Sequence, residues 1–304
     1  MLSKLSISDK LTLQKILAFI CTLSLFVAFR NKSFVIYVVA LTLGYSHYLL
    51  GAIYRLMSKR KVARGGPLLL IVLGVLVYIY SSNGLALDSK NQLLTLIVTL
   101  YAIFHVVVDD QFSSNFFKSK YSYSQQLGCM SLISLLASVQ LFQQFNTNFT
   151  VVLVFAGLFF NFLYIYSLSR EGHSLANYWV LFQISAVYLL IASNLRLGLG
   201  VVLYFIGIYH ILLFYMHYFT KIASLEKSKN LLHSKKGYLA LVFIVNASIL
   251  IMYAISKTLN ISSVAFIFSY NFFLIVNLLH FISSTRFYEF REFFKGSQSL
   301  VKLK

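Results

Sequence analysis

Residues 198–219 read GLGVVLYFIGIYHILLFYMHYF, a run that contains no charged residue. A helix needs about 20 consecutive, predominantly apolar residues to cross the hydrocarbon core of a bilayer. This stretch therefore predicts a transmembrane helix. It also contains two histidines, His210 and His217. They are unexpected there, because the residues around them are almost all apolar or aromatic and could face lipid.

The rest of the chain has the same character. Of its 304 residues, 59% are hydrophobic and 11% are charged, whereas soluble domains are about a quarter charged. Apolar runs recur along the whole length and leave no polar interval long enough for a separate soluble domain. We therefore expect an all-α fold, a polytopic integral membrane helical bundle that forms a single transmembrane domain over residues 1–304.

Ten apolar runs are long enough to be membrane spans. They cover residues 12–29, 34–54, 67–82, 92–108, 127–143, 149–168, 177–193, 198–219, 237–256 and 262–283. The only proline, Pro67, stands at the first position of a span, where a missing amide hydrogen costs little. We therefore expect about ten transmembrane helices, each of them continuous.

Basic residues are distributed unevenly between the two ends of these spans. With the N-terminus inside, the inner segments hold 21 Lys and Arg, Lys15 among them, and the outer segments hold 5. Because Lys and Arg accumulate in cytoplasmic loops, both termini are expected in the cytoplasm. The net charge of +18 then indicates topology and contact with anionic lipid headgroups, with no nucleic acid as a partner. A multi-pass protein of a bacterial inner membrane is the expected setting.

Five of the seven histidines lie inside predicted spans, namely His47, His105, His210, His217 and His280. Each of these spans runs from outside to inside, and each histidine lies toward the cytoplasmic end, about 6–16 Å from the first charged residue of the inner boundary. Ionisable groups inside a membrane are costly and usually face a functional interior. As a set, these histidines predict a shared layer near the cytoplasmic leaflet, although any single one can equally be hydrogen-bonded to a neighbouring helix.

The spacing of these residues limits how they can act. His210 and His217 project from one face with about 10.5 Å between their levels, so one helix alone cannot bring both onto one ion. Asp109 follows His105 by one helical turn, which permits shared ligation or a carboxylate that orients the imidazole. Asp109 and its neighbour Asp110 can equally be helix-end residues at the headgroups.

Polar neighbours accompany two of the histidines. Tyr45, Ser46 and Tyr48 surround His47, and Asn277 precedes His280 by three residues. The sequence contains no Gly-x-Ser-x-Gly elbow, phosphate-binding loop, His-Glu-x-x-His or Cys-x-x-Cys motif.

Imidazoles suit iron, zinc and copper, and with one or two carboxylates added, iron is the first expectation and zinc the second. The expected metal ligands are His47, His105, His210, His280 and Asp109. Asp109 and His217 are the expected catalytic groups, Asp109 as a ligand or a carboxylate behind the ligands and His217 as a ligand or proton carrier.

Several short segments carry a family resemblance. They are SHYLLG with His47, FHVVVDD with His105 and Asp109, YHILLFYMH with His210 and His217, and LLHF with His280. In these the chain resembles the Brp/Blh family of membrane-embedded β-carotene dioxygenases. The resemblance implies iron held by intramembrane histidines and oxidative cleavage of a carotenoid to retinal. In composition the chain also looks like zinc lipid hydrolases of the alkaline ceramidase kind.

Two classes of function follow. The first is a membrane-embedded, metal-dependent oxidoreductase, with non-haem iron, that acts on a hydrophobic lipid or isoprenoid substrate entering from the bilayer. The alternative is a non-catalytic subunit or transporter that packs against partner membrane proteins. Against a coupled transporter, the predicted spans contain no mid-membrane Asp or Glu, and no proline marks a broken helix.

Overall fold

The regular structure of the protein is helical throughout the part of the chain that the computed structural model describes. That part comprises residues 7–57, 87–114, 123–142, 147–171, 174–193, 201–224, 234–259 and 262–284. No strand occurs within these ranges. The expected span at residues 67–82, with Pro67, lies outside them.

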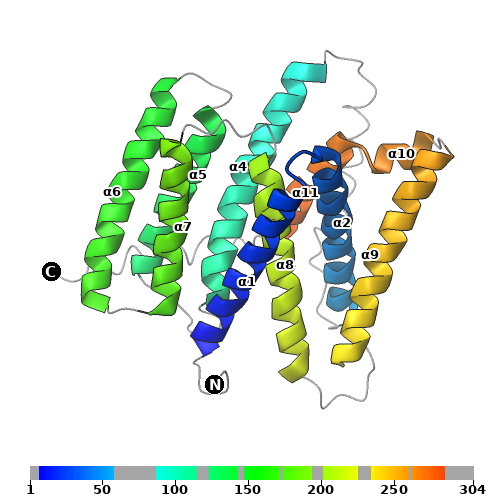
Figure 1. The fold of residues 1–304 in the computed structure, drawn as a ribbon, viewed down its shortest axis with the longest axis horizontal. Helices are drawn as coiled ribbons and strands as arrows, with labels where there is room; N and C mark the ends of the chain where they lie inside the picture. The colour runs from blue at the N-terminus through cyan, green and yellow to red at the C-terminus, as the bar shows by residue number, and fades with distance from the viewer. Residues whose placement is uncertain are drawn as a thin grey trace. The chain divides into compact units, whose positions relative to one another are not determined.

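The helices agree with most of the predicted spans (Figure 1). In chain order they are α1 (Ile7–Ala28), α2 (Ser33–Met57), α4 (Leu87–Ser114), α5 (Tyr123–Phe142), α6 (Thr147–Glu171), α7 (Leu175–Ala192), α8 (Val201–Ser224), α9 (Lys235–Thr258), α10 (Ser262–Ile267) and α11 (Tyr270–Ser284). Six of them, α1, α2, α6, α7, α8 and α9, contain stretches long and apolar enough to cross a membrane. The chain is thus a helical membrane protein.

Large apolar side chains are exposed on five of these six helices, namely α1, α2, α6, α7 and α9. On α6, for example, the side chains of Phe155, Phe159 and Phe162 are 65%, 59% and 69% exposed. In water a contiguous apolar surface of this kind marks an interaction site or promotes aggregation. Against lipid tails it is the ordinary surface of a transmembrane helix, which agrees with a membrane location.

The described residues form two compact units. Unit 1 contains residues 7–19, 99–114, 123–142, 147–171, 174–193 and 201–206, and unit 2 contains residues 20–57, 87–98, 207–224, 234–259 and 262–283. Within unit 1, α5 packs against α6 and α7, and within unit 2, α9 packs against α2 and α10 (Figure 1). The single domain expected from the sequence stays a prediction.

A glycine allows the close contact between α5 and α6 in unit 1. A Cβ atom at Gly157 would lie 2.6 Å from Cδ2 of Leu135, so only glycine fits there without a shift. The hydroxyl of Ser131 donates to the carbonyl oxygen of Gly157 at 3.0 Å. Small residues and interhelical hydrogen bonds are the usual means by which membrane helices associate.

The last predicted span is broken, which corrects the expectation of continuous helices. α10 ends at Ile267 and α11 begins at Tyr270, with Phe268 and Ser269 between them. The expectation of a continuous helix relied on the absence of proline within the span. Here the break is stabilised by side chains and needs no proline. Ser269 Oγ accepts the backbone N–H of Phe272 at 3.3 Å and so caps the start of α11.

Two tyrosines of α2 satisfy carbonyl groups at this break. Tyr45 donates its hydroxyl to the carbonyl oxygen of Ile267 at 2.6 Å, and Tyr37 donates to that of Phe268 at 2.8 Å. Non-helical backbone is tolerated at membrane depth only where protein or water satisfies its polar groups. These two hydrogen bonds therefore hold α2 against the segment that carries His280.

Candidate metal site

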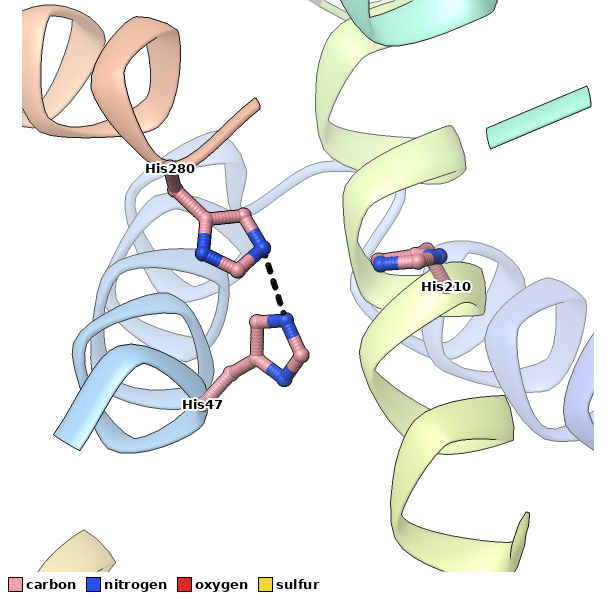
Figure 2. A group of neighbouring side chains, drawn as sticks. All are labelled: His47, His210 and His280. Carbon is pink, nitrogen blue, oxygen red and sulfur yellow. Dashed lines mark hydrogen bonds between the residues drawn. The ribbon is translucent and has the colours of Figure 1, made fainter. Parts of the chain in front are cut away.

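Three of the expected ligands converge in unit 2. His47 lies on α2, His210 on α8 and His280 on α11, and their ligand nitrogens all lie within 4.8 Å of one another. Figure 2 shows the three imidazoles facing a common space between these helices. Residues separated by up to 233 positions in the sequence thus share one site.

The closest pair is His47 and His280. Their Nε2 atoms lie 3.0 Å apart and share a hydrogen bond, in which one ring donates and the other accepts (Figure 2). Two imidazole nitrogens bound to one ion at about 2.0–2.1 Å, with an angle of about 90–110° between the bonds, would lie about 2.8–3.4 Å apart. This pair is therefore already spaced as two ligands of one ion would be.

His210 completes the group from α8. Its ring centroid lies 5.5 Å from that of His47, and the two planes are 83° apart. Since no pair of ligand atoms exceeds 4.8 Å, an ion would have to draw the nitrogens together by about 1.5 Å at most. Small side-chain rotations supply such a shift, so the three residues fit a metal ion.

The site is enclosed by protein. His47 is 3% exposed and His210 is 7% exposed, while His280 is half-buried. Phe214 packs its ring at 4.1 Å from the His47 ring, at 88°, and Tyr48 lies 4.5 Å from the His280 ring. These aromatic rings pack against the imidazoles and reduce their contact with solvent, and electrostatic interactions are stronger in such a setting than in water.

Helical periodicity explains why these neighbours lie where they do. Phe214 follows His210 by four residues and therefore lies on the same face of α8. Asn277 precedes His280 by three residues on α11. The hydroxyl of Tyr48 donates to Oδ1 of Asn277, so the residue next to His47 is joined to the helical turn that carries His280.

A close approach of α2 and α11 brings His47 and His280 within hydrogen-bonding distance. A Cβ atom at Gly44 would lie 2.8 Å from Cε2 of Phe273. Gly44 is three residues before His47, and Phe273 is two turns before His280. The missing side chain at Gly44 therefore contributes to the 3.0 Å spacing of the imidazoles.

A second hydrogen-bonded group lies beside the histidines and connects α2, α8 and α9. Ser46 Oγ and the hydroxyl of Tyr215 lie 2.7 Å apart, and Asn246 Nδ2 donates to the same hydroxyl at 3.5 Å. Tyr238 donates to the carbonyl oxygen of Tyr215 at 3.2 Å. These bonds hold α2 and α8, which carry two of the three histidines, in a defined arrangement.

Sequence reasoning did not identify Gly44, Phe214 or Tyr215 as residues of this site. The one available signal for Phe214 was its position one turn after His210. Gly44 and Tyr215 carry no such signal, because their roles depend on partners from other helices.

The other expected site residues do not belong to this group. His217 is half-buried on α8 and its ring lies 6.4 Å from that of Tyr218. Its separation of two turns from His210 agrees with the limit expected from the helix geometry. His105 and Asp109 lie on α4 in unit 1, and their part in metal binding stays a prediction.

Unit 1 contains a buried ion pair that corrects one expectation. Lys15 and Asp110 are 1% and 4% exposed, with Lys15 Nζ 3.3 Å from Asp110 Oδ2. Lys15 also donates to the backbone oxygen of Asp110. Lys15 is therefore not a solvated topology charge, and Asp110, about one turn before the end of α4 at Ser114, is buried with it. Charged residues are costly inside a membrane, and the attraction between these two opposite charges offsets part of that cost.

Comparison with known proteins adds no relative. No protein-family model, curated protein or solved structure matches this chain. The function must therefore be argued from the geometry of the three-histidine group and its surroundings.

Proposed function

We propose that this protein is a membrane-embedded metalloenzyme that holds an ion with His47, His210 and His280. The observation that carries the proposal is the convergence of three imidazoles from three helices within 4.8 Å. Helical bundles commonly build metal sites from side chains on facing helices. The apolar setting favours a lipid or isoprenoid substrate that enters from the bilayer.

The proposal has two candidate metals, iron and zinc. Iron is the first candidate because of the resemblance to the Brp/Blh family. Zinc is supported by the donor set, since among the described residues the group holds three histidines and no carboxylate. Three histidines with an open position form a known zinc site, whereas many non-haem iron oxygenases use two histidines and one carboxylate.

The ion and the surrounding residues would have different roles in the reaction. A bound ion would supply either redox chemistry with dioxygen or Lewis-acid activation of water. The imidazoles would hold it through their nitrogen lone pairs, and Phe214 and Tyr48 would exclude bulk water from the reacting atoms. His105 and Asp109 are retained as proposed auxiliary ligands, and His217 as a proposed proton carrier.

Elemental analysis of the purified full-length protein tests the metal site. After reconstitution with Fe(II) or Zn(II), we expect about one ion per chain, lost in His47→Ala, His210→Ala and His280→Ala. His217→Ala is the matched control, because it removes an imidazole of α8 that lies outside the group, and it should keep the ion. A wild-type protein that retains neither metal would refute the proposal.

Isotope labelling tests the reaction. The loaded protein is incubated in lipid vesicles with β-carotene, or with a ceramide, and the products are analysed by mass spectrometry. Label from ¹⁸O₂ in the product supports the iron oxygenase, while label from H₂¹⁸O with dioxygen absent supports the zinc hydrolase. No conversion of either substrate by metal-loaded protein would argue against both of these substrate classes.

We further propose the topology of about ten spans with both termini in the cytoplasm of a bacterial inner membrane. The uneven distribution of Lys and Arg supports the orientation. Reporter fusions at each terminus and at Arg30, in the predicted outer turn between α1 and α2, test it. Reporters active only in the periplasm should be silent at both termini and active at Arg30.

A transporter is the alternative, and the break between α10 and α11 favours it. Discontinuous membrane helices often form the binding sites of transporters. Proteoliposomes containing a metal-sensitive dye would distinguish the two functions. Saturable entry of Zn(II) or Fe(II) that is lost in His210→Ala would support transport, and entry equal to that in protein-free liposomes would oppose it.

A further inference from the structure

We propose that Tyr48 and Asn277 form a positioning pair that holds His280 in its ligating orientation. This inference rests on the proposed metal site, and concerns how that site is assembled. Tyr48 is the residue after His47 on α2, and Asn277 stands one turn before His280 on α11. Each partner of the pair thus adjoins one of the two closest histidines.

The contacts of Tyr48 restrict His280 in two ways. Its ring lies 4.5 Å from the His280 ring with 34° between the planes, so it covers one face of the imidazole. Its hydroxyl donates to Oδ1 of Asn277, which prevents the tyrosine ring from turning away. The same ring lies 5.7 Å from that of His47, so one side chain contacts both ligands.

Asn277 is itself fixed at its other end. Its Nδ2 donates to the backbone oxygen of Phe273 at 2.7 Å, and the side chain is 8% exposed. With the amide held in this way, Oδ1 is directed to the hydroxyl of Tyr48. The orientation of the tyrosine is therefore set by the backbone of α11, the helix that also carries His280.

Among the described side chains of α2, three tyrosine hydroxyls reach the α10–α11 segment and provide an internal comparison. Tyr37 and Tyr45 donate to backbone carbonyls at the helix break, and only Tyr48 donates to a side chain beside a histidine. All three bonds join the same two segments. If loss of the Tyr48 hydroxyl weakens metal binding and loss of the Tyr37 or Tyr45 hydroxyl does not, the effect is due to positioning of His280 and not to general stability.

Groups that orient metal ligands typically change metal affinity about 10- to 100-fold when removed. We expect Tyr48→Phe, which removes only the hydroxyl, to weaken binding of Co(II) by about that factor and to alter its visible absorption band. Asn277→Ala should give the same loss. The double variant should be no weaker than either single variant, because both remove one interaction.

Tyr37→Phe is the matched control in the full-length protein. It removes the same atom from the same helix, and should lower thermal stability while leaving the Co(II) dissociation constant and spectrum unchanged. Should Tyr48→Phe fail to accumulate, Asn277→Ala gives the same test. Co(II) affinity of Tyr48→Phe or Asn277→Ala within twofold of wild type would overturn the inference and leave the metal site standing. Absence of Co(II) binding by wild type would overturn both.

Discussion

Lys15 and Asp110 form an ion pair inside unit 1, with Nζ 3.3 Å from Oδ2 and both side chains almost fully buried. The two residues are 95 positions apart and lie on α1 and α4. A charge in such a place depends on its partner, because lipid offers no other way to solvate it.

The first prediction concerns this pair. Lys15→Met or Asp110→Asn alone should destabilise the protein by about 3–5 kcal/mol, because each leaves an uncompensated buried charge. The double variant should recover much of that loss. Unfolding in a denaturing detergent, followed by circular dichroism, measures the difference, and purely additive losses would contradict a direct interaction.

The second prediction concerns the close approach of α2 and α11. Gly44→Ala places a methyl group 2.8 Å from the ring of Phe273, which is itself 4% exposed and cannot move freely. The expected cost is about 1–3 kcal/mol, together with weaker metal binding as the His47–His280 spacing widens. Metal titration and thermal unfolding report the two effects.

Gly51→Ala is the matched control for that substitution. It lies on the same helix, and a Cβ atom there would meet nothing within 4 Å. Since alanine is a better helix former than glycine by about 1 kcal/mol, this variant should be as stable as wild type or more so. Equal losses at Gly44 and Gly51 would show that packing against Phe273 is not the cause.

The third prediction concerns the break between α10 and α11. Tyr45→Phe leaves the carbonyl of Ile267 without its hydroxyl donor, which should cost about 1–3 kcal/mol. Tyr123→Phe is the comparison, because Tyr123 is 40% exposed and its substitution should change stability little. Thermal unfolding of both variants in the same detergent checks this, and equal melting temperatures would contradict it.

The fourth prediction concerns the lipid-facing surface of α6. Phe159 is 59% exposed in a helix apolar enough to cross a membrane. An arginine near the centre of such a helix costs about 2.5–3.5 kcal/mol on insertion scales. Phe159→Arg should therefore reduce the fraction of protein that resists alkaline extraction from membranes, whereas Phe159→Leu should not. Unchanged membrane integration of the arginine variant would place this face away from lipid.

Much of the helical fold could be predicted because hydropathy is a property of consecutive residues. The predicted span at 237–256 agrees closely with α9, Lys235–Thr258. The tenth span was predicted less well, because its break is made by Ser269 and by tyrosines of another helix. A prediction that considers only proline within the span cannot detect these partners.

The candidate site was predictable only in outline. Counting residues along each span predicted a depth for each histidine, and that depth stays a prediction. Whether His47 meets His280 or His217 depends on which way each helix is rotated and which helices are neighbours. Four of the five histidines in predicted spans were expected as ligands, and the structure groups three of these four.

Sequence alone thus determined that this is a helical membrane protein, since about 20 apolar residues in a row leave the backbone only one inexpensive conformation in lipid. Tertiary structure decided which imidazoles share a site, why Lys15 can be buried, and where the last span breaks. Each of these depends on a pair of residues far apart in the chain, such as His47 with His280 or Lys15 with Asp110. Packing alone brings such pairs within the few ångströms over which hydrogen bonds and ion pairs act.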